Sequence, residues 1–283
     1  MHIKVTADST CDLSEQLLRQ YDITLMPLIV VKEGVPFYDG QTITPEEIFR
    51  HVEEGGDLCG TAARNPEEYG DFFRKLRSEY DAVIHISLGS GFSATCQNAR
   101  IAAQELEDVY VVDSQNLSTG QGLVVLEACR LASGGGDVRE MVRKLESFTQ
   151  RVETSFLLSR LDYMVKGGRC SAVAALGVNF LKLKPCIEVS NGRMRVCKKY
   201  RGTFEHCIRN YIQDRLGPAR EDLDRSRLFL TYTPVEQSAL QAARSAIESC
   251  PPFSQRMQTQ AGCTVSCHCG PGTLGVLFVR QEP

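Results

Sequence analysis

No stretch of this 283-residue sequence is apolar for long enough to cross a lipid bilayer. The longest apolar segment, at residues 23–31, contains Pro27, whereas a spanning helix needs about 20 consecutive apolar residues. The first residues lead directly into a strand pattern and lack the apolar core and small-residue cleavage site of a signal peptide. We therefore expect a cytoplasmic protein with no stable membrane insertion.

Charges of one sign are not gathered into blocks either. The chain carries 32 basic and 35 acidic residues, a formal net charge of −3, and both signs are scattered along it. Nucleic-acid-binding proteins usually concentrate basic residues on one face or in one segment, and no helix-turn-helix pattern is present. The composition, with 42% hydrophobic and 24% charged residues, is typical of a folded globular protein. We therefore expect a globular fold that does not bind nucleic acid.

The paired Cys-x-x-Cys spacing of a structural zinc site is also missing. The 12 cysteines are spread through apolar helix and strand patterns, where a reduced thiol serves as a small core residue. Disulfides are rare in cytosolic proteins, so we expect mostly free thiols. One cluster, Cys263, Cys267, His268 and Cys269, contains metal-ligating residue types in the wrong spacing. We expect neither a metal nor another cofactor.

Strands and helices alternate in the first half of the sequence. Thr44 and Asn65 are each followed by proline and two glutamates, a strong signal for the start of a helix. Strands are expected at 3–7, 23–31, 82–88 and 109–113, and further helices at 14–21, 93–107, 120–132 and 138–151. This alternation predicts a parallel α/β sheet with helices on both faces.

The second half has a different pattern, and we place a domain boundary after the helix at 138–151. A chain of this length accommodates two domains, so we predict an N-terminal α/β domain at 1–152 and a smaller C-terminal α/β domain at 153–283. Asn191-Gly192 predicts a hairpin turn, because both residues tolerate positive φ. The expected strands of this half are 154–158, 186–189, 193–198, 227–232 and 274–279, and its helices are 160–165, 172–183, 203–216 and 235–249.

The segment 87–97 carries the most informative pattern for function. A buried strand ends in small residues and hydroxyls, and a helix follows. The unpaired N–H groups at a helix start suit a carboxylate or phosphate, and Ser93 or Thr95 can add a hydroxyl donor. The alternative is that Ser93 only caps the helix. The spacing matches neither a Walker A loop nor a dinucleotide fingerprint.

Four other positions are weaker candidates on their own. Thr61 lies in a small polar loop before a helix, and Ser9 follows the end of the first strand; either can simply cap the next helix. Arg169 follows two glycines that end a helix, where a solvated arginine is the plainer interpretation. His268 lies in a glycine-rich turn at 267–273, where a histidine is either structural or functional.

Taken together, these segments resemble the DegV family. The order and spacing of the matching segments are specific, and they cover nearly the whole chain: 8–13, 86–97, 111–114, 161–169, 171–173, 181–185 and 268–275. The resemblance implies a two-domain α/β fold with a long-chain, palmitate-like fatty acid held between the domains. It also implies a lipid-binding protein rather than an enzyme.

The resemblance further implies a role for each candidate residue. Thr61 and Ser93 would hydrogen-bond the carboxylate, with Arg169 and His268 near the head group. Ser9 and Thr95 are additional ligand-binding candidates at strand and helix ends. Members of the family act as the acyl-binding subunit of a bacterial fatty acid kinase. An ATP-dependent kinase subunit, for which Arg201 would be a docking residue, phosphorylates the carboxylate, and the acyl phosphate feeds phospholipid synthesis.

The sequence departs from the family pattern in two places. The loop after Thr61 usually reads Thr-Ser-Gln-Pro-Ser, but here it reads Thr-Ala-Ala-Arg-Asn, which removes polar donors and adds the charge of Arg64. The position after Ser93 is usually glycine and is Ala94 here, a residue compatible with a helix start. We expect the pocket to persist, with altered contacts around the head group.

The alternative from another class is a serine hydrolase acting on a lipid ester or acyl group through Ser93 and His268. The Gly-x-Ser-x-Gly pattern of a nucleophile elbow is incomplete, since Thr95 stands where the second glycine belongs. No acid that would orient His268 is evident in the sequence, although a catalytic triad is defined in space rather than along the chain.

Overall fold

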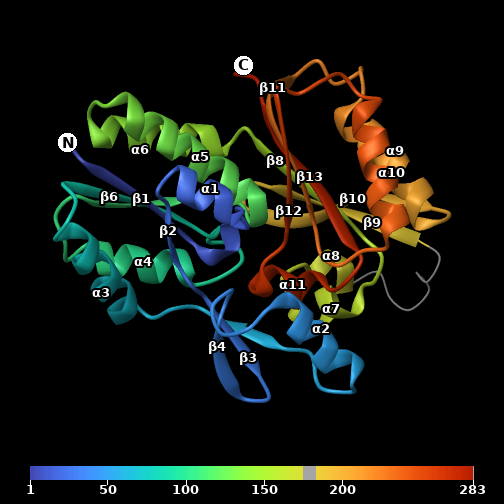
Figure 1. Cartoon of the computed structure of the whole chain (residues 1–283), viewed down its shortest axis with the longest axis horizontal. Helices are drawn as coiled ribbons and strands as arrows, with labels where there is room; N and C mark the ends of the chain where they lie inside the picture. The colour runs from blue at the N-terminus through green and yellow to red at the C-terminus, as the bar shows by residue number, and fades with distance from the viewer. Residues whose placement is uncertain (175–182, 283) are drawn as a thin grey trace.

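The computed structural model describes residues 1–174 and 183–282, which form two main sheets flanked by helices (Figure 1). The first sheet is wholly parallel, with the strand order β2-β1-β6-β7. Its strands are β1 (Ile3–Asp8), β2 (Thr24–Met26), β6 (Ala82–Ser87) and β7 (Val109–Asp113). β1 and β6 are buried almost throughout, as expected for parallel strands covered on both faces.

Helices cover both faces of this sheet, which confirms the predicted α/β class. On one face lie α3 (Pro66–Arg77) and α4 (Thr95–Ala103); on the other lie α1 (Glu15–Gln20), α5 (Ser118–Gly134) and α6 (Val138–Thr149) (Figure 1). The predicted helix start at Asn65 is confirmed by a reciprocal capping box with Glu68. The helix expected at 93–107 is shorter at both ends: residues 93 and 94 precede it, and it ends at Ala103.

The second sheet is mixed and has the order β10-β9-β8-β13-β11-β12, in which only β11 and β12 are parallel neighbours. Its strands are β8 (Val152–Leu158), β9 (Leu183–Ser190), β10 (Arg193–Arg201), β11 (Leu223–Tyr232), β12 (Gln255–Gln260) and β13 (Thr273–Arg280). Helices α9 (Phe204–Leu216) and α10 (Gln237–Glu248) cover one face (Figure 1). The predicted hairpin is confirmed, with φ of 49° at Asn191 and 68° at Gly192.

Helix α5 lies between the two sheets, and this position explains its apolar sequence. It is buried on nearly all sides, so it lacks the polar face of a surface helix. Side chains of both sheets join it in a single hydrophobic cluster, including Val5 and Ile84 from the first sheet and Phe229 and Leu277 from the second. The second sheet begins at Val152, where the domain boundary was placed; the boundary itself stays a prediction.

A small antiparallel sheet, β4-β3-β5, lies beside the ends of both large sheets. It consists of β3 (Ile29–Lys32), β4 (Val35–Tyr38) and β5 (Gly60–Ala62), accompanied by α2 (Pro45–Glu53), α7 (Asp162–Gly167), α8 (Ser171–Ala174) and α11 (Cys263–Cys269). The capping box at Thr44 opens α2 as predicted. Among the residues that the structure describes, 1–174 and 183–282, no helix is both long and apolar enough to cross a membrane.

Four expectations about local structure need correction. The single strand expected at 23–31 is wrong, because Pro27 divides it into β2 and β3, which belong to different sheets. The loop at Thr61 contains β5, and His268 lies in the last turn of α11 rather than in a loop. Strand β12 was not anticipated. The helix expected at 172–183 lies largely outside the described residues, while α8 precedes that segment and β9 follows it.

Candidate functional site

A cavity of about 70 Å³ lies where the carboxyl end of the parallel sheet meets β5 and α11. Four of the predicted ligand-binding residues line it together: Thr61, Ser93, Arg169 and His268. They come from β5, from the turn before α4, from the end of α7 and from α11, so four distant segments of the chain converge here. Ligands of α/β proteins gather at this end of a parallel sheet.

Thr61 and His268 form a hydrogen bond at the polar end of the cavity. The Oγ1 atom of Thr61 is 2.8 Å from Nε2 of His268. The other ring nitrogen, Nδ1, is buried and has no hydrogen-bond partner among the described residues. A proton on Nε2 would be donated to Thr61, whose own hydroxyl proton is then free to point at a ligand.

His268 is held in its neutral form. Burial, and to a smaller extent the positive charge of Arg169, lower the pKa of the imidazole to about 4. The exposed Arg169 side chain donates from Nη1 to the carbonyl oxygen of Gly167, 2.6 Å away, at the rim of the cavity. The polar end therefore offers neutral donors inside and one cation at its rim.

Ser93 lines the cavity and also bonds the first residue of α4, although the N-cap position itself is Ala94, which makes no side-chain capping bond. Its Oγ atom accepts a hydrogen bond from the backbone N–H of Thr95 at 3.2 Å and is 2.8 Å from the Thr95 hydroxyl. Ala94 has helical angles, with φ of −71°, which alanine adopts without strain. The half-buried Ser93 hydroxyl therefore lies at the N-terminus of α4 with its orientation fixed by Thr95.

The remainder of the cavity is apolar and continues inward. Leu28, Leu88, Phe92, Met194 and Val265 are among its lining residues. A second cavity of about 30 Å³ shares Leu117, Val265 and Cys269 with the first and extends to Phe156 and Leu277 in the second sheet. The two cavities therefore adjoin across these three residues. The first is polar at the end near Thr61, and the lining of the second combines apolar side chains with hydroxyl residues such as Ser155, Thr231 and Thr273.

Two buried aspartates hold α11, and therefore His268, in place. Asp39 accepts hydrogen bonds from the backbone N–H groups of Cys263 at 2.8 Å and Thr264 at 3.2 Å, and so caps the helix. Asp12 accepts from the backbone N–H of Gly262 at 2.9 Å. Side-chain oxygens that accept from the first N–H groups of a helix satisfy donors that have no partner within the helix.

Three predicted residues lie outside the lining of the cavity. Ser9 donates its hydroxyl to Asp39 at 2.9 Å and accepts from the backbone of Leu28, so it supports the clamp on α11. Thr95 is fully buried beneath Ser93. Arg201 is exposed at the end of β10. Their ligand-binding and docking roles stay predictions.

Thr10 was missed by the sequence reasoning, although it lines the cavity next to the predicted Ser9. Its hydroxyl donates to the side-chain carbonyl of Gln121 at 2.8 Å.

The side chain of Arg64 points away from the head-group end of the cavity. Its Nε donates to the carbonyl of Pro27, and its guanidinium stacks on Tyr38. The altered loop therefore presents Ala62 and Ala63 to the cavity instead of a cation.

The arrangement does not match a hydrolase. Nε2 of His268 is bonded to Thr61 rather than to Ser93, and no carboxylate among the described residues bonds Nδ1. A general base needs both contacts to activate a serine. Cysteines such as Cys11, Cys129 and Cys263 are free thiols, as expected, and the described residues contain no group of three or more His, Cys, Asp or Glu side chains placed to hold a metal ion.

Fold and site together define an α/β protein of two main sheets with two adjoining cavities, the first of which has hydroxyls and a histidine at one end and apolar side chains beyond them. A family model described as uncharacterised proteins of the DegV family matches residues 2–281, so the chain belongs to the DegV family. It is 31% identical over 283 residues to a DegV domain-containing protein of Clostridium acetobutylicum, covering 99% of both chains.

Two further relatives have names that refer to a ligand. A protein of Thermotoga maritima named fatty acid-binding protein is 29% identical over 292 residues, which cover 97% of this chain and 96% of the relative. A solved structure of a DegV family protein from Thermus thermophilus, described by its fatty acid binding, superposes with a TM-score of 0.91 at 29% identity, covering 99% of this chain and 100% of that one.

Proposed function

We propose that this protein binds a long-chain, palmitate-like fatty acid, with the carboxylate at Thr61 and Ser93 and the acyl chain along the apolar side chains of the cavity. The observation that carries the proposal is the first cavity, in which Thr61, Ser93 and His268 gather at one end and apolar side chains such as Leu28, Leu88 and Phe92 line the remainder, with a second cavity adjoining it. Fatty acid binding by the relatives from Thermotoga and Thermus supports the same conclusion.

The energetics assign different tasks to the two ends of the ligand. Each buried methylene contributes about 0.8 kcal/mol, so the acyl chain supplies most of the affinity. The hydroxyls of Thr61 and Ser93 and the N-terminus of α4 hold the carboxylate without a buried cation, because His268 is neutral. The head group therefore fixes orientation more than affinity.

Binding requires the lining to open. The cavities measure about 70 and 30 Å³, whereas ligand pockets usually start near about 300 Å³. Met194 has a flexible thioether side chain that adapts to irregular ligands, and Phe92 is a large side chain beside Ser93. We therefore expect rotation of these two side chains to widen the cavity.

The proposed role of the bound fatty acid rests on the family resemblance. A carboxylate that neutral donors hold near the mouth of the cavity keeps its oxygens free to attack a phosphoryl donor. The guanidinium of Arg169 at the rim suits a nearby anion. The protein would then present the carboxylate to an ATP-dependent kinase subunit in the cytoplasm, docked through Arg201, and the acyl phosphate would enter phospholipid synthesis. The protein itself would perform no chemistry.

Denaturing mass spectrometry of the purified protein tests the proposal. Recovery of about one fatty acid per chain is expected, and Ser93→Ala should weaken phosphorylation by the kinase subunit more than it weakens lipid retention. Ser90→Ala is the matched control, since the Ser90 hydroxyl bonds Asp113 outside the cavity. A protein that is empty after purification and takes up no added fatty acid would disprove the proposed function.

A further inference from the structure

Cys197 differs from every other cysteine of the chain. It is the one exposed cysteine, whereas the other eleven of the 12 are buried. It lies in β10 at a β-bulge, where the register shifts between Val196 and Lys198. A bulged residue is left out of the strand ladder and is turned by the local kink, so its side chain becomes accessible.

Cys186 lies directly across the strand pair from this bulge. Cys186 is opposite Lys198, and Ile187 is opposite Val196, so Cys197 is the inserted residue between the two pairs. Cys197 itself has no residue directly opposite, and its chain neighbour Lys198 faces Cys186, so the two cysteines are neighbours across the strand pair. The Cys197 thiol also contacts the backbone oxygen of Cys186, at 3.4 Å.

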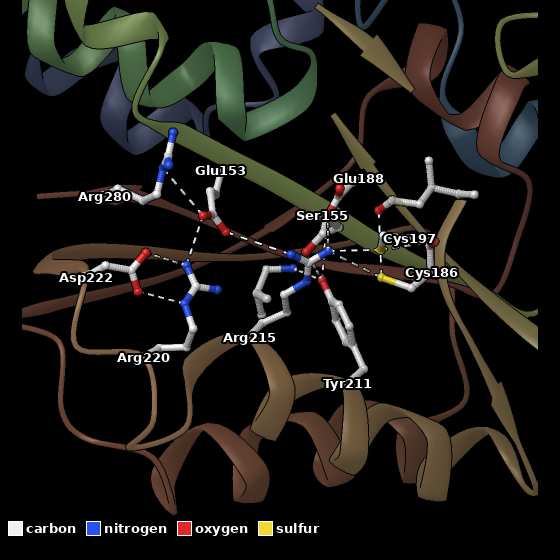
Figure 2. A network of polar contacts seen from close by, with 12 residues as sticks. Glu153, Ser155, Cys186, Glu188, Cys197, Tyr211, Arg215, Arg220, Asp222 and Arg280 are labelled. Atoms are coloured by element: carbon white, nitrogen blue, oxygen red, sulfur yellow. Dashed lines mark hydrogen bonds and ion pairs between the residues drawn. The ribbon is translucent and has the colours of Figure 1, made fainter. Parts of the chain in front are cut away.

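The guanidinium of Arg215 lies against both sulfur atoms (Figure 2). Its Nη2 atom is 3.0 Å from Sγ of Cys197 and 4.0 Å from Sγ of Cys186. The same nitrogen is 2.7 Å from Glu188, and Nη1 is 3.9 Å from Glu153, which fixes the guanidinium between strand and helix. A fixed cation beside a sulfur atom stabilises the thiolate.

The pKa values of the two thiols are shifted in opposite directions. A hydrogen bond from Cys186 and the charge of Arg215 lower the pKa of Cys197, against the opposing effects of burial and of the nearby Glu188 carboxylate. The hydrogen bond with Cys197 and its own burial raise the pKa of Cys186. The exposed Cys197 is therefore the more easily deprotonated thiol of the pair, and the buried Cys186 holds its proton.

We propose that Cys197 is a nucleophilic cysteine that peroxides oxidise, with Cys186 as its resolving partner. The Cys197 thiolate attacks a peroxide oxygen, the O–O bond breaks, and a sulfenic acid and hydroxide form. The sulfur of Cys186 then attacks the Cys197 sulfur as its proton leaves, and the departing hydroxyl takes up a proton to become water. Two thiols and one hydrogen peroxide thus give one disulfide and two waters, with the peroxide reduced.

This site is separate from the proposed fatty acid cavity, whose lining does not include Cys186, Cys197 or Arg215. The proposal therefore stands whether or not the chain binds a fatty acid. It also accounts for a feature that a purely structural role does not require, an arginine placed on a thiol pair at an exposed bulge.

Peptide mapping after treatment of the whole protein with hydrogen peroxide tests the proposal. Free thiols are blocked with N-ethylmaleimide, and trypsin then releases residues 183–193 and 196–198 as separate peptides, since it does not cut the Lys184-Pro185 bond. We expect these two peptides to appear joined and to separate on reduction. Cys197→Ser should abolish the joined species, and Cys129→Ser, at a buried thiol elsewhere, should leave it unchanged.

Alkylation kinetics test the role of Arg215 independently of oxidation. Iodoacetamide should label Cys197 faster than a cysteine in an unstructured peptide at neutral pH, and Arg215→Gln should slow it by about tenfold, the effect of one pKa unit. Arg195→Gln is the control, because Arg195 also pairs with Glu188 but contacts neither sulfur. Labelling of wild-type Cys197 at the peptide rate, or peroxide oxidation of Cys197 without a bond to Cys186, would overturn the proposal.

Discussion

The Thr61 hydroxyl lies 2.8 Å from Nε2 of His268, although 207 positions separate the two residues in the sequence. Thr61 belongs to the small sheet, and His268 belongs to a helix whose N-terminus is capped by Asp39. The pair therefore joins two parts of the fold at the polar end of the cavity, and a ligand bound there is sensitive to the position of both.

Removal of the Thr61 hydroxyl should weaken binding of a fatty acid. Thr61→Val keeps the shape of the side chain but leaves Nε2 of His268 without a partner and removes a donor to the carboxylate. We expect the dissociation constant to rise by about tenfold, or about 1.4 kcal/mol, measured by titration calorimetry.

Thr61→Ser is the matched control, because it retains the hydroxyl and should bind within about threefold of wild type. A fatty alcohol of equal chain length should respond less to Thr61→Val than the acid does, because it presents no carboxylate. Equal losses for acid and alcohol would show that Thr61 does not contact the head group.

The low pKa of His268 makes a prediction about pH. The folded pKa, about 4, is below the ordinary value of 6.5, so between these values the unfolded chain binds more protons than the folded one. The contribution of His268 to stability is therefore complete above about pH 6.5 and is lost as the pH falls toward 4. The ring signals of His268 in NMR spectra should not shift between about pH 5.5 and pH 8.

Arg169→Gln should raise the pKa of His268 without restoring 6.5, since burial is the larger cause. Arg160→Gln is a suitable control, because Arg160 pairs with Asp162 and does not line the cavity. A His268 signal that titrates near pH 6.5 in the wild-type protein would contradict the assignment of a neutral ring.

Local signals explain which parts of the fold could be predicted from the sequence. The helix starts at Thr44 and Asn65 depend on residues within one turn, so the capping pattern is sufficient. The hairpin at Asn191 is equally local. Strand β12 is different: its sequence is polar, and as the last strand of the sheet it has only Thr259 buried, so no hydrophobic period marks it.

In the candidate site, too, some residues can be predicted from local sequence signals and others depend on the tertiary structure. The hydroxyls and glycines that follow strand ends indicate that Ser93 and Thr61 belong to a site, because parallel strands end at one edge of a sheet. Sequence cannot choose between Ser9 and Thr10, since both are hydroxyl residues after the same strand. The direction of the turn at Ser9–Cys11 decides it and brings Thr10 to the cavity. The register of β9 and β10, which places Cys186 beside Cys197, is likewise a tertiary property.

Asp12 should make stability fall as the pH rises. Burial raises its pKa from 3.8 to about 8, despite hydrogen bonds from Ser118 and Gly262 that oppose the shift. The folded protein therefore binds more protons than the unfolded chain between about pH 4 and pH 8, and stability is lost across this window. Urea unfolding at several pH values measures the slope.

Asp12→Asn removes this titration while keeping a residue that tolerates the positive φ of 50° found here. The variant should show a smaller loss of unfolding free energy between about pH 5 and pH 8 than wild type. Asp57→Asn, at an exposed carboxylate, is the control and should follow wild type. Identical pH slopes for wild type and Asp12→Asn would rule out a buried, protonated Asp12.

Gly167→Ala should disturb His268 from the other side. A Cβ atom at position 167 would lie 2.5 Å from Nδ1 of His268, so the ring must move and its bond to Thr61 must lengthen. We expect weaker fatty acid binding, similar to Thr61→Val, and shifted His268 signals. Gly134→Ala is the control, because a Cβ there meets no atom within 4 Å. If Gly167→Ala left both the affinity and the His268 signals unchanged, the ring position would have no part in holding the head group.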